Sequence, residues 1–196
     1  MNDTPDHYVD PNAALLASWA TLSEGATNRL AIAHTPAFVT IGLNDEPRIR
    51  TVVLRRCDPA SRRLFFHTDT RSDKVRDLAR NPKSAVHVYD SGQKIQLRLE
   101  CRSRVLTEGD DFDAAWIATR PFSRECYHVT TGPGSTLEDP AVLKFSADLT
   151  ADGLDYFAAV EITVEVMEWL YLHSGGHRRA RFVWQDGQWT SEWLVP

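Results

Sequence analysis

Three segments of this sequence gather basic side chains at places where an acidic ligand could bind. The first, RTVVLR at 50–55, has an arginine at each end of an apolar run. The second, HTDTRSDK at 67–74, leads from an expected strand into an expected helix. The third, YLHSGGHRRARF at 171–182, places two glycines beside a dense basic cluster. Each segment also has a purely structural explanation: charges on an edge strand, a capped helix and a solvated loop.

Anion recognition is the chemistry that these residue types offer. Arg50 and Arg55 are five positions apart, so on one regular strand they point to opposite faces. A helix that begins near Ser72 offers free N–H groups and its dipole to an anion, and Lys74 adds a positive charge. The basic loop is a local excess in an acidic protein, which also favours an acidic ligand.

Motifs for covalent catalysis or nucleotide binding are absent from the sequence. It contains no GxSxG, no GxGxxG and no GxxxxGKS or GxxxxGKT. His173 and His177 are four positions apart, but the glycines between them break the helical face that a metal pair needs, so we expect no metal site. If the chain is an enzyme, its chemistry therefore comes from a cofactor, and we assign no catalytic residue.

Length and composition indicate one globular domain. The chain has 196 residues, of which 42% are apolar and 25% charged. With 22 Lys and Arg against 27 Asp and Glu, the net charge of −5 weighs against a general nucleic-acid binder. Three cysteines without a CxxC pair indicate reduced thiols, and neither a signal peptide nor an apolar run of about 20 residues is present. We therefore expect a cytoplasmic protein without membrane or nucleic-acid partners.

The helices that position the basic segments follow from hydrophobic periodicity. After a loose tail over 1–9, the residues Asp10-Pro11-Asn12 start a helix that we expect over 12–24. Its apolar residues recur at helical spacing and are Leu15, Leu16, Trp19 and Leu22. A second, short helix is expected over 72–82, with Ser72 as its N-cap.

Strands dominate the rest of the chain. β-branched and aromatic residues predict a three-stranded meander, followed by five further strands. The expected ranges are 37–43, 47–56, 62–68, 84–90, 94–107, 158–173, 178–185 and 188–196, with Asp186-Gly187 as a hairpin turn. Between them we expect a helix over 108–120, an irregular functional segment over 121–140 and another helix over 141–154. About eight short strands joined by hairpins favour an antiparallel sheet or barrel.

Taken together and in this order, the three basic segments resemble the pyridoxamine 5'-phosphate oxidase superfamily, whose members are split β-barrels that bind flavin mononucleotide (FMN). The resemblance covers residues 30–196, which would form the FMN-binding domain after an N-terminal tail and helix over 1–29. It implies a mainly β fold with flanking helices (α+β), built as an antiparallel split β-barrel in a single domain overall.

The resemblance implies an FMN site with residues from all three segments. Arg50 and Lys74 would contact the FMN phosphate, while Tyr171 would stand where the family has a tryptophan beside the flavin. Asp73 departs from the family pattern and removes one positive charge. The full set of implied FMN-binding residues is Arg50, Thr51, Val52, Val53, Arg55, His67, Thr68, Ser72, Lys74, Gln96, Tyr171 and Arg181.

The family also implies a homodimer with FMN at the subunit interface. The partner chain would bring its Tyr171 and Arg181 to the Arg50 and Lys74 of the first chain.

The substrate positions match the family less well than the FMN positions. They read Arg55, Trp116, Arg120 and Arg124, with His177 and Arg179 where the family has an Arg-x-His motif. Pro133-Gly134-Ser135 replaces a glutamine-serine pair near the flavin. These departures imply a small anionic substrate in a pocket that differs from that of the oxidase.

We therefore expect an FMN-dependent oxidoreductase that uses oxygen or a nicotinamide to turn over the flavin. Oxidation of pyridoxine or pyridoxamine phosphate is one form of this activity, with hydride transfer to the flavin. The alternative is a flavin-binding module, such as a sensor, carrier or storage protein, with little or no turnover. A nucleic-acid binder that uses the basic loop is a third and more distant reading.

Overall fold

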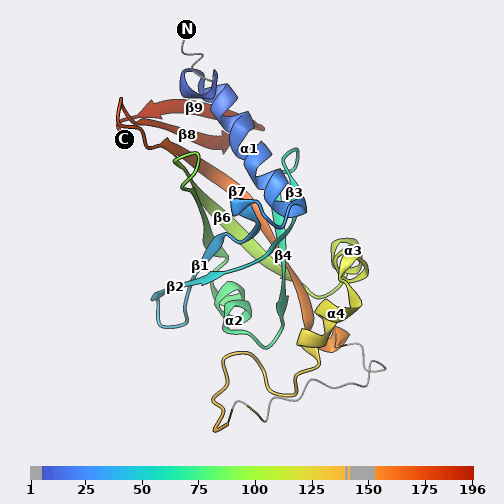
Figure 1. Ribbon diagram of the computed structural model, residues 1–196. Coiled ribbons are helices and arrows are strands. Elements are labelled where there is room, and N and C mark those ends of the chain that lie inside the picture. Colours follow the sequence, from blue (N-terminus) through green and yellow to red (C-terminus); the bar gives the residue numbers. More distant parts are fainter. Residues whose placement is uncertain (1–5, 140, 142–152) are drawn as a thin grey trace.

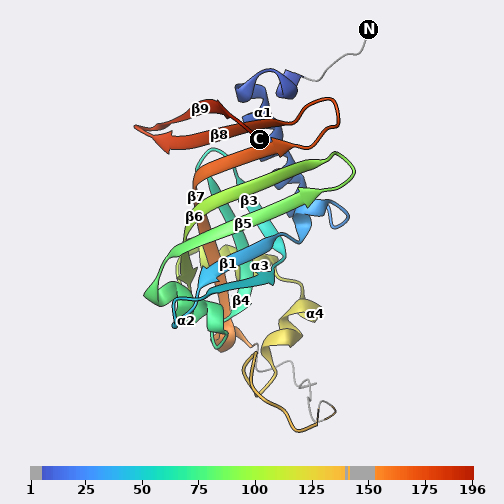
Figure 2. The same cartoon turned by 90° about the vertical axis from the view of Figure 1, so that its left-hand side faces the viewer.

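The computed structural model describes residues 6–139, 141 and 153–196, and one long antiparallel sheet forms its centre (Figures 1 and 2). Its strands are β1 (Ala37–Ile41), β2 (Pro47–Thr51), β3 (Leu54–Asp58), β4 (Arg63–Asp69), β5 (Lys83–Asp90), β6 (Ile95–Leu106), β7 (Phe157–Tyr171), β8 (Arg178–Gln185) and β9 (Gln188–Leu194). The α-helices are α1 (Pro11–Thr27), α2 (Asp73–Arg80), α3 (Asp110–Ala118) and α4 (Pro121–Arg124), and the 3-10 helices are η1 (Asp6–Tyr8), η2 (Ile32–His34), η3 (Glu125–Tyr127) and η5 (Leu154–Tyr156). The predicted mainly β fold with flanking helices is confirmed.

The strand order forces the sheet to curl. Neighbouring strands follow the path β2-β1-β5-β6-β7-β4-β3, and β8 and β9 extend from β7. The two ends of this path, β2 and β3, are consecutive in the sequence and are joined by only Val52-Val53. Because the three Cα–Cα steps from Thr51 to Leu54 span at most about 11 Å, the opposite edges of the sheet must approach each other. The result is an open barrel, since β2 and β3 do not pair.

The expected meander over 37–68 is wrong at its middle strand. The segment 47–56 does not form one strand but breaks at Val52, whose side chain enters the core while its N–H bonds to the Pro36 carbonyl. The first half pairs with β1, and the second half pairs with β4 at the other end of the path. The apolar run therefore passes from one edge strand of the sheet to the other. This break explains why the described residues form nine strands where the sequence predicted about eight.

The helical predictions are confirmed in outline. The Asp10 carboxylate accepts the Asn12 N–H at 2.9 Å, so α1 begins where the sequence indicated. Trp19 and Leu22 are buried in the main core, but Leu16 is exposed and was wrongly placed there. The helix packs against β3 and the β7–β9 end of the sheet, as Figure 1 shows.

Two segments are more ordered than the sequence predicted. The tail is not loose throughout, because residues 6–8 form η1 and the Tyr8 ring stacks on Tyr171 with centroids 4.1 Å apart. The segment 121–140 is not wholly irregular, because it opens with α4 and η3. The helix expected over 141–154 falls mostly on residues outside the described ranges. The division of the chain at residue 29 stays a prediction.

The β8–β9 hairpin confirms its predicted turn. Asp186 and Gly187 both have positive φ, at 51° and 79°, as the two central residues of a type I′ turn require. The main core lies inside the curled sheet and is closed by α1. Its largest fully buried side chains include Phe38, Phe66, Trp169 and Phe182.

Candidate functional site

The end of β4 and the start of α2 bring three of the predicted FMN-binding side chains together. The Lys74 ammonium donates to the Thr68 hydroxyl at 3.0 Å, and the Ser72 hydroxyl lies 3.1 Å from the same oxygen. Ser72 occupies the N-cap position but does not cap α2 through its side chain, because its hydroxyl donates to the Asp69 carbonyl at 2.7 Å. The predicted N-cap position is confirmed, but the Ser72 side chain leaves the first N–H groups of the helix to other partners.

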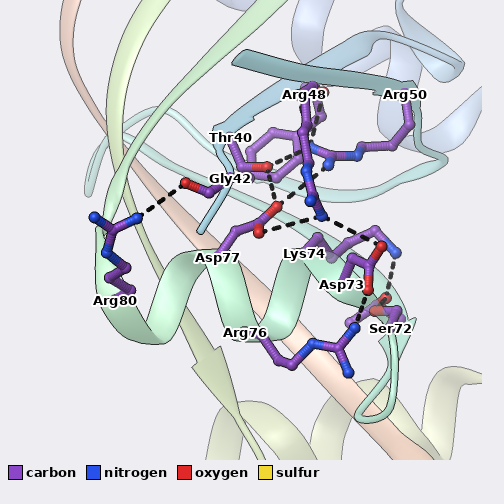
Figure 3. A network of polar contacts seen from close by, with 12 residues as sticks. Thr40, Gly42, Arg48, Arg50, Ser72, Asp73, Lys74, Arg76, Asp77 and Arg80 are labelled. Carbon is purple, nitrogen blue, oxygen red and sulfur yellow. Dashed lines mark hydrogen bonds and ion pairs between the residues drawn. The ribbon is translucent and has the colours of Figure 1, made fainter. Parts of the chain in front are cut away.

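Arg50 reaches the same place from β2 (Figure 3). Its Nη1 donates to the Thr40 hydroxyl at 2.7 Å and to the Arg48 carbonyl at 2.9 Å. Its Nη2 lies 3.5 Å from the carboxylate of Asp77, a fully buried side chain on α2. Burial lowers the pKa of Lys74, and the nearby charge of Arg50 lowers it further. We call Arg50, Thr68, Ser72 and Lys74 the α2 cradle.

The α2 cradle fits a phosphate by the chemistry of its donors. It offers an ammonium, two hydroxyls and the outer edge of a guanidinium, whose Nε has no hydrogen-bond partner among the described residues. Asp73, the departure that removed one positive charge, does not oppose this. Its carboxylate is held by Arg48 at 3.3 Å and by Arg76, so its charge is already matched.

A second set of predicted residues lines a cavity of about 380 Å³ between α3, β3–β4 and the end of α1. We call it the arginine cavity, because Arg29, Arg55, Arg56 and Arg120 all line it. Arg55 is the extra residue of a β-bulge, since Leu54 pairs with Phe66 and Arg56 pairs with Phe65. A bulge re-aims a side chain, which gives Arg55 its direction toward the cavity.

Four of the six predicted substrate residues do not line this cavity, and two of these four, Trp116 and Arg124, lie beside its α3 wall. The Arg124 guanidinium lies 4.1 Å from the centre of the Trp116 ring and donates to the Trp116 carbonyl at 2.8 Å. Trp116 in turn packs on Phe157, with ring centroids 5.0 Å apart, beside a small buried cluster. The pair therefore braces the end of α3, which carries the cavity wall.

His67 is a neutral ring at the edge of the arginine cavity. Its Nδ1 lies 3.1 Å from the Thr119 hydroxyl, and the ring packs edge-on against Phe157. Burial lowers its pKa from 6.5 to about 4, and the positive charge of Arg55 adds to the effect. The predicted position beside the flavin site is thus held by an uncharged imidazole at neutral pH.

Five other predicted residues lie at the start of β6, at the end of β7, and on β8 or in the turn before it, and these parts of the sheet lie away from α2 in Figure 1. Gln96 is half-buried on β6 between Tyr89 and Leu170. Tyr171 is covered by Tyr8, while Arg181 on β8 has a buried Nε without a hydrogen-bond partner. His177 accepts the His173 N–H at 3.0 Å, and Arg179 donates to Glu168 at 2.7 Å. Within one chain, this far-end group does not meet the α2 cradle.

Sequence reasoning missed several residues of the site. Arg29, which precedes η2, and His34, the last residue of η2, line the arginine cavity. The Asp77 carboxylate forms an ion pair with Arg50. A second cavity of about 240 Å³ lies between Arg71 and the segment that contains Pro133-Gly134-Ser135. Among the described residues, no group of His, Cys, Asp and Glu could hold a metal ion, and no helix is long and apolar enough to cross a membrane.

Known proteins resemble this chain in sequence and in fold. Residues 16–107 match the family model described as pyridoxamine 5'-phosphate oxidase, FMN-binding domain. A pyridoxine/pyridoxamine 5'-phosphate oxidase of Mannheimia succiniciproducens is 30% identical over 166 residues, which cover 80% of this chain and 76% of that protein. Pyridoxine/pyridoxamine 5'-phosphate oxidase 2 of Arabidopsis thaliana is 34% identical over 130 residues, covering 61% of this chain and 65% of the relative.

Two solved structures match nearly the whole chain. One is a pyridoxamine 5'-phosphate oxidase-related, FMN-binding protein from Nostoc punctiforme, with a TM-score of 0.73 and 17% identity over 96% of this chain and 99% of that one. The other is PhzG from Burkholderia lata in complex with tetrahydrophenazine-1-carboxylic acid, with a TM-score of 0.75 and 19% identity over 100% of this chain and 99% of that one. These likenesses confirm the predicted split-barrel fold.

The depressed pKa of His67 generates a prediction for stability against pH. The folded pKa of about 4 lies below the unfolded value of 6.5, so between these pH values the unfolded chain binds more protons and stability falls as the pH falls. His67→Gln should remove this part of the dependence, up to about 3 kcal/mol between pH 7 and 4. Urea unfolding of both proteins across this range measures it, and parallel curves for the two proteins would contradict the assignment.

Proposed function

This chain belongs to the pyridoxamine 5'-phosphate oxidase family, and we propose that it binds FMN and works as an FMN-dependent oxidoreductase on a small anionic substrate. When bound, FMN supplies the capacity to accept a hydride from a substrate carbon. The chain's own residues bind and orient the cofactor and the substrate, and no side chain is proposed as a general base.

The observation that carries the proposal is the α2 cradle. Lys74 and Ser72 both lie within hydrogen-bond distance of the Thr68 hydroxyl, and the positive charge of Arg50, on a strand at the other edge of the sheet path, acts on Lys74. Two positive charges beside a helix start are suited to a phosphate dianion. Thr51, Val52 and Val53, which follow Arg50, would carry the backbone past the ligand.

The substrate side of the proposal rests on the arginine cavity. Arg55 and Arg120 line it together with the neutral ring of His67, so it suits an acidic group. Trp116 and Arg124 would support the α3 wall of this cavity through their contacts with each other. His177 and Arg179 belong to the far-end group.

A homodimer with FMN at its interface would complete the site. Thr68 is opposite Ala158 on β7, and Tyr171 ends the same strand thirteen residues later. At about 3.3 Å per residue, these points are about 40 Å apart along the strand, which is much longer than FMN. Tyr171, Arg181 and Gln96 could therefore reach a cradle-bound FMN only from a second subunit.

Exposed apolar side chains support such an interface. Ile49, Ile117 and Phe122 are 71%, 78% and 80% exposed, and they lie on β2, α3 and α4, the elements that border the α2 cradle and the arginine cavity. A subunit interface would remove them from water. We also propose a cytoplasmic location, which the free thiols of Cys57, Cys101 and Cys126 support.

Lys74→Ala should weaken the affinity for FMN by roughly 10–150-fold, because a charge-assisted hydrogen bond contributes about 1.5–3 kcal/mol to binding. Riboflavin, which lacks the phosphate, should bind the variant almost as well as the wild type. Fluorescence quenching of each flavin measures both affinities. Lys83→Ala, an exposed lysine on β5, is the matched control. Equal losses for both flavins, or none, would remove Lys74 from the phosphate site.

The shared site predicts complementation between two defective chains. Lys74→Ala damages one side of the proposed site and Arg181→Ala the other, so each homodimer should bind FMN poorly. Mixed dimers would contain one intact site, and random mixing should restore about a quarter of the wild-type sites. Light scattering should give twice the chain mass of 22.1 kDa. A monomer that binds FMN tightly, or mixing without recovery, would exclude the shared site.

The altered substrate positions predict weak or no oxidation of pyridoxine 5'-phosphate. His177 and Arg179 do not reproduce the family's Arg-x-His order. Three arginines that the oxidase pattern lacks, Arg55, Arg124 and Arg178, favour other anions. Oxygen uptake by FMN-loaded protein with pyridoxine and pyridoxamine phosphates should stay below about 1 s⁻¹, the lower end of ordinary turnover. Faster turnover would refute this. A bound flavin that NADH, NADPH and small amines all fail to reduce would instead favour the flavin-binding module.

A further inference from the structure

Three side chains from three elements form a closed triangle of polar contacts beside the α2 cradle (Figure 3). The Arg50 Nη1 on β2 donates to the Thr40 hydroxyl on β1 at 2.7 Å, and that hydroxyl donates to the Asp77 carboxylate on α2 at 2.8 Å. The same carboxylate oxygen lies 3.5 Å from the Arg50 Nη2, which closes the triangle. Thr40 and Asp77 are both 0% exposed, whereas the Arg50 side chain is 22% exposed. Of the three, Arg50 therefore extends from the interior to a place that a ligand can reach.

The direction of each hydrogen bond in this triangle is fixed by the groups themselves. A guanidinium has only donors and a carboxylate has only acceptors, so the hydroxyl between them must accept from Arg50 and donate to Asp77. Valine has nearly the shape of threonine but could serve neither partner. A hydroxyl that serves both partners restricts the guanidinium to an orientation that keeps both of its contacts.

The register of β1 and β2 brings Arg50 to Thr40. Phe38 is opposite Arg50 and Thr40 is opposite Arg48, so Thr40 and Arg50 are diagonal neighbours on one face of the strand pair. Because threonine is β-branched, its hydroxyl has little freedom to turn away. The Arg50 Nη1 also donates to the Arg48 carbonyl at 2.9 Å. Acceptors on the two strands thus hold Nη1, while the carboxylate of α2 holds Nη2.

The triangle also offsets a repulsion within the α2 cradle. Burial lowers the pKa of Lys74, and the positive charge of Arg50 lowers it further, so the two cations act on each other. Neighbouring like charges are unfavourable unless an opposite charge joins them. Burial lowers the pKa of Arg50 as well, but the negative charge of Asp77 raises it. The triangle therefore keeps a second positive charge beside Lys74 before any ligand binds.

A purely structural role is the competing explanation for the triangle. Thr40 and Asp77 join β1 to α2, and this contact contributes to the packing of the helix. An apolar pair of similar volume could make the same connection at no greater cost, because buried charges lose their hydration. What an apolar pair could not supply is the orientation of Arg50.

We propose that Thr40 and Asp77 are positioning residues, which hold the Arg50 guanidinium in the orientation that receives the phosphate group of a bound flavin. Thr40 thereby contributes to the preference of the cradle for a flavin that carries a phosphate over one that does not. This inference rests on the proposed function. It adds that a fully buried hydroxyl, out of reach of the ligand, governs how tightly the phosphate is held.

The test compares Thr40→Val, which keeps the shape of the side chain, with Thr40→Ser, which keeps the hydroxyl. Fluorescence quenching gives the affinity of each variant for FMN and for riboflavin. Thr40→Val should weaken the affinity for FMN by roughly 5–30-fold, because a released guanidinium must be ordered again when the phosphate binds. The affinity for riboflavin should change by less than about 2-fold, and Thr40→Ser should stay within about 3-fold of the wild type for both flavins.

A positioning residue acts through its partner, so a double-mutant cycle with Arg50 is the decisive measurement. Arg50→Gln removes the charge that Thr40 positions, and in this background Thr40→Val should change the affinity for FMN by less than about 2-fold. Full additivity of the two substitutions would overturn the proposal. Asp77→Asn is a weaker test, because it leaves Arg48 and Arg50 beside an uncharged amide and costs stability.

Thr190→Val is the matched control, because it makes the same substitution on β9, where the hydroxyl donates to the Val183 carbonyl at 3.2 Å. It should leave both affinities unchanged. Equal losses for the two flavins in Thr40→Val, or no loss for either, would assign Thr40 to the fold alone and overturn the proposal.

The wild type and Arg50→Gln separate this proposal from the proposed function. A wild type that binds FMN no more tightly than riboflavin would remove the phosphate from the cradle and overturn both claims. A preference for FMN that Arg50→Gln abolishes and Thr40→Val leaves intact would overturn the positioning role alone.

Discussion

The two-residue link between β2 and β3 is the constraint on which the rest of this structure depends. Because Val52-Val53 must connect the two ends of the strand path, the sheet has to curl into an open barrel around a core that Val52 itself enters. The same link places Arg50 on one edge and Arg55 on the other. One short basic segment therefore supplies both the α2 cradle and the arginine cavity.

The buried carboxylate of Asp77 ties α2 to the first of these edges. It accepts the Thr40 hydroxyl at 2.8 Å and lies 3.5 Å from Arg50 and 3.7 Å from Arg48 (Figure 3). Removing one partner of a buried ion pair costs about 3–5 kcal/mol, because the other charge is left buried and unpaired. Asp77 therefore holds the Nη2 side of the Arg50 guanidinium.

Local periodicity predicted the strands and most helices, because alternation and helical spacing are properties of the neighbouring residues. It could not predict which edges a strand joins, so the apolar run at 47–56 looked like one strand. The bulge at Arg55 arises from the register in which β3 pairs with β4. The direction of the Ser72 hydroxyl is set by its hydrogen bond to the Asp69 carbonyl at the end of β4. The only local signal for Arg29 was Gly25 within an otherwise regular helix, which marks a close backbone approach.

The N-terminal segment contacts residues of the predicted site near both of its ends. At its start, Tyr8 stacks on Tyr171 of the far-end group, and just beyond its other end Arg29 enters the arginine cavity. The seventeen residues of α1 span about 25 Å between these two points. A domain boundary drawn at residue 29 separates η1, α1 and Arg29 from the groups that they contact. α1 also packs on β3, the strand that carries Arg55 and forms one wall of the arginine cavity, so the same helix contacts both regions of predicted site residues.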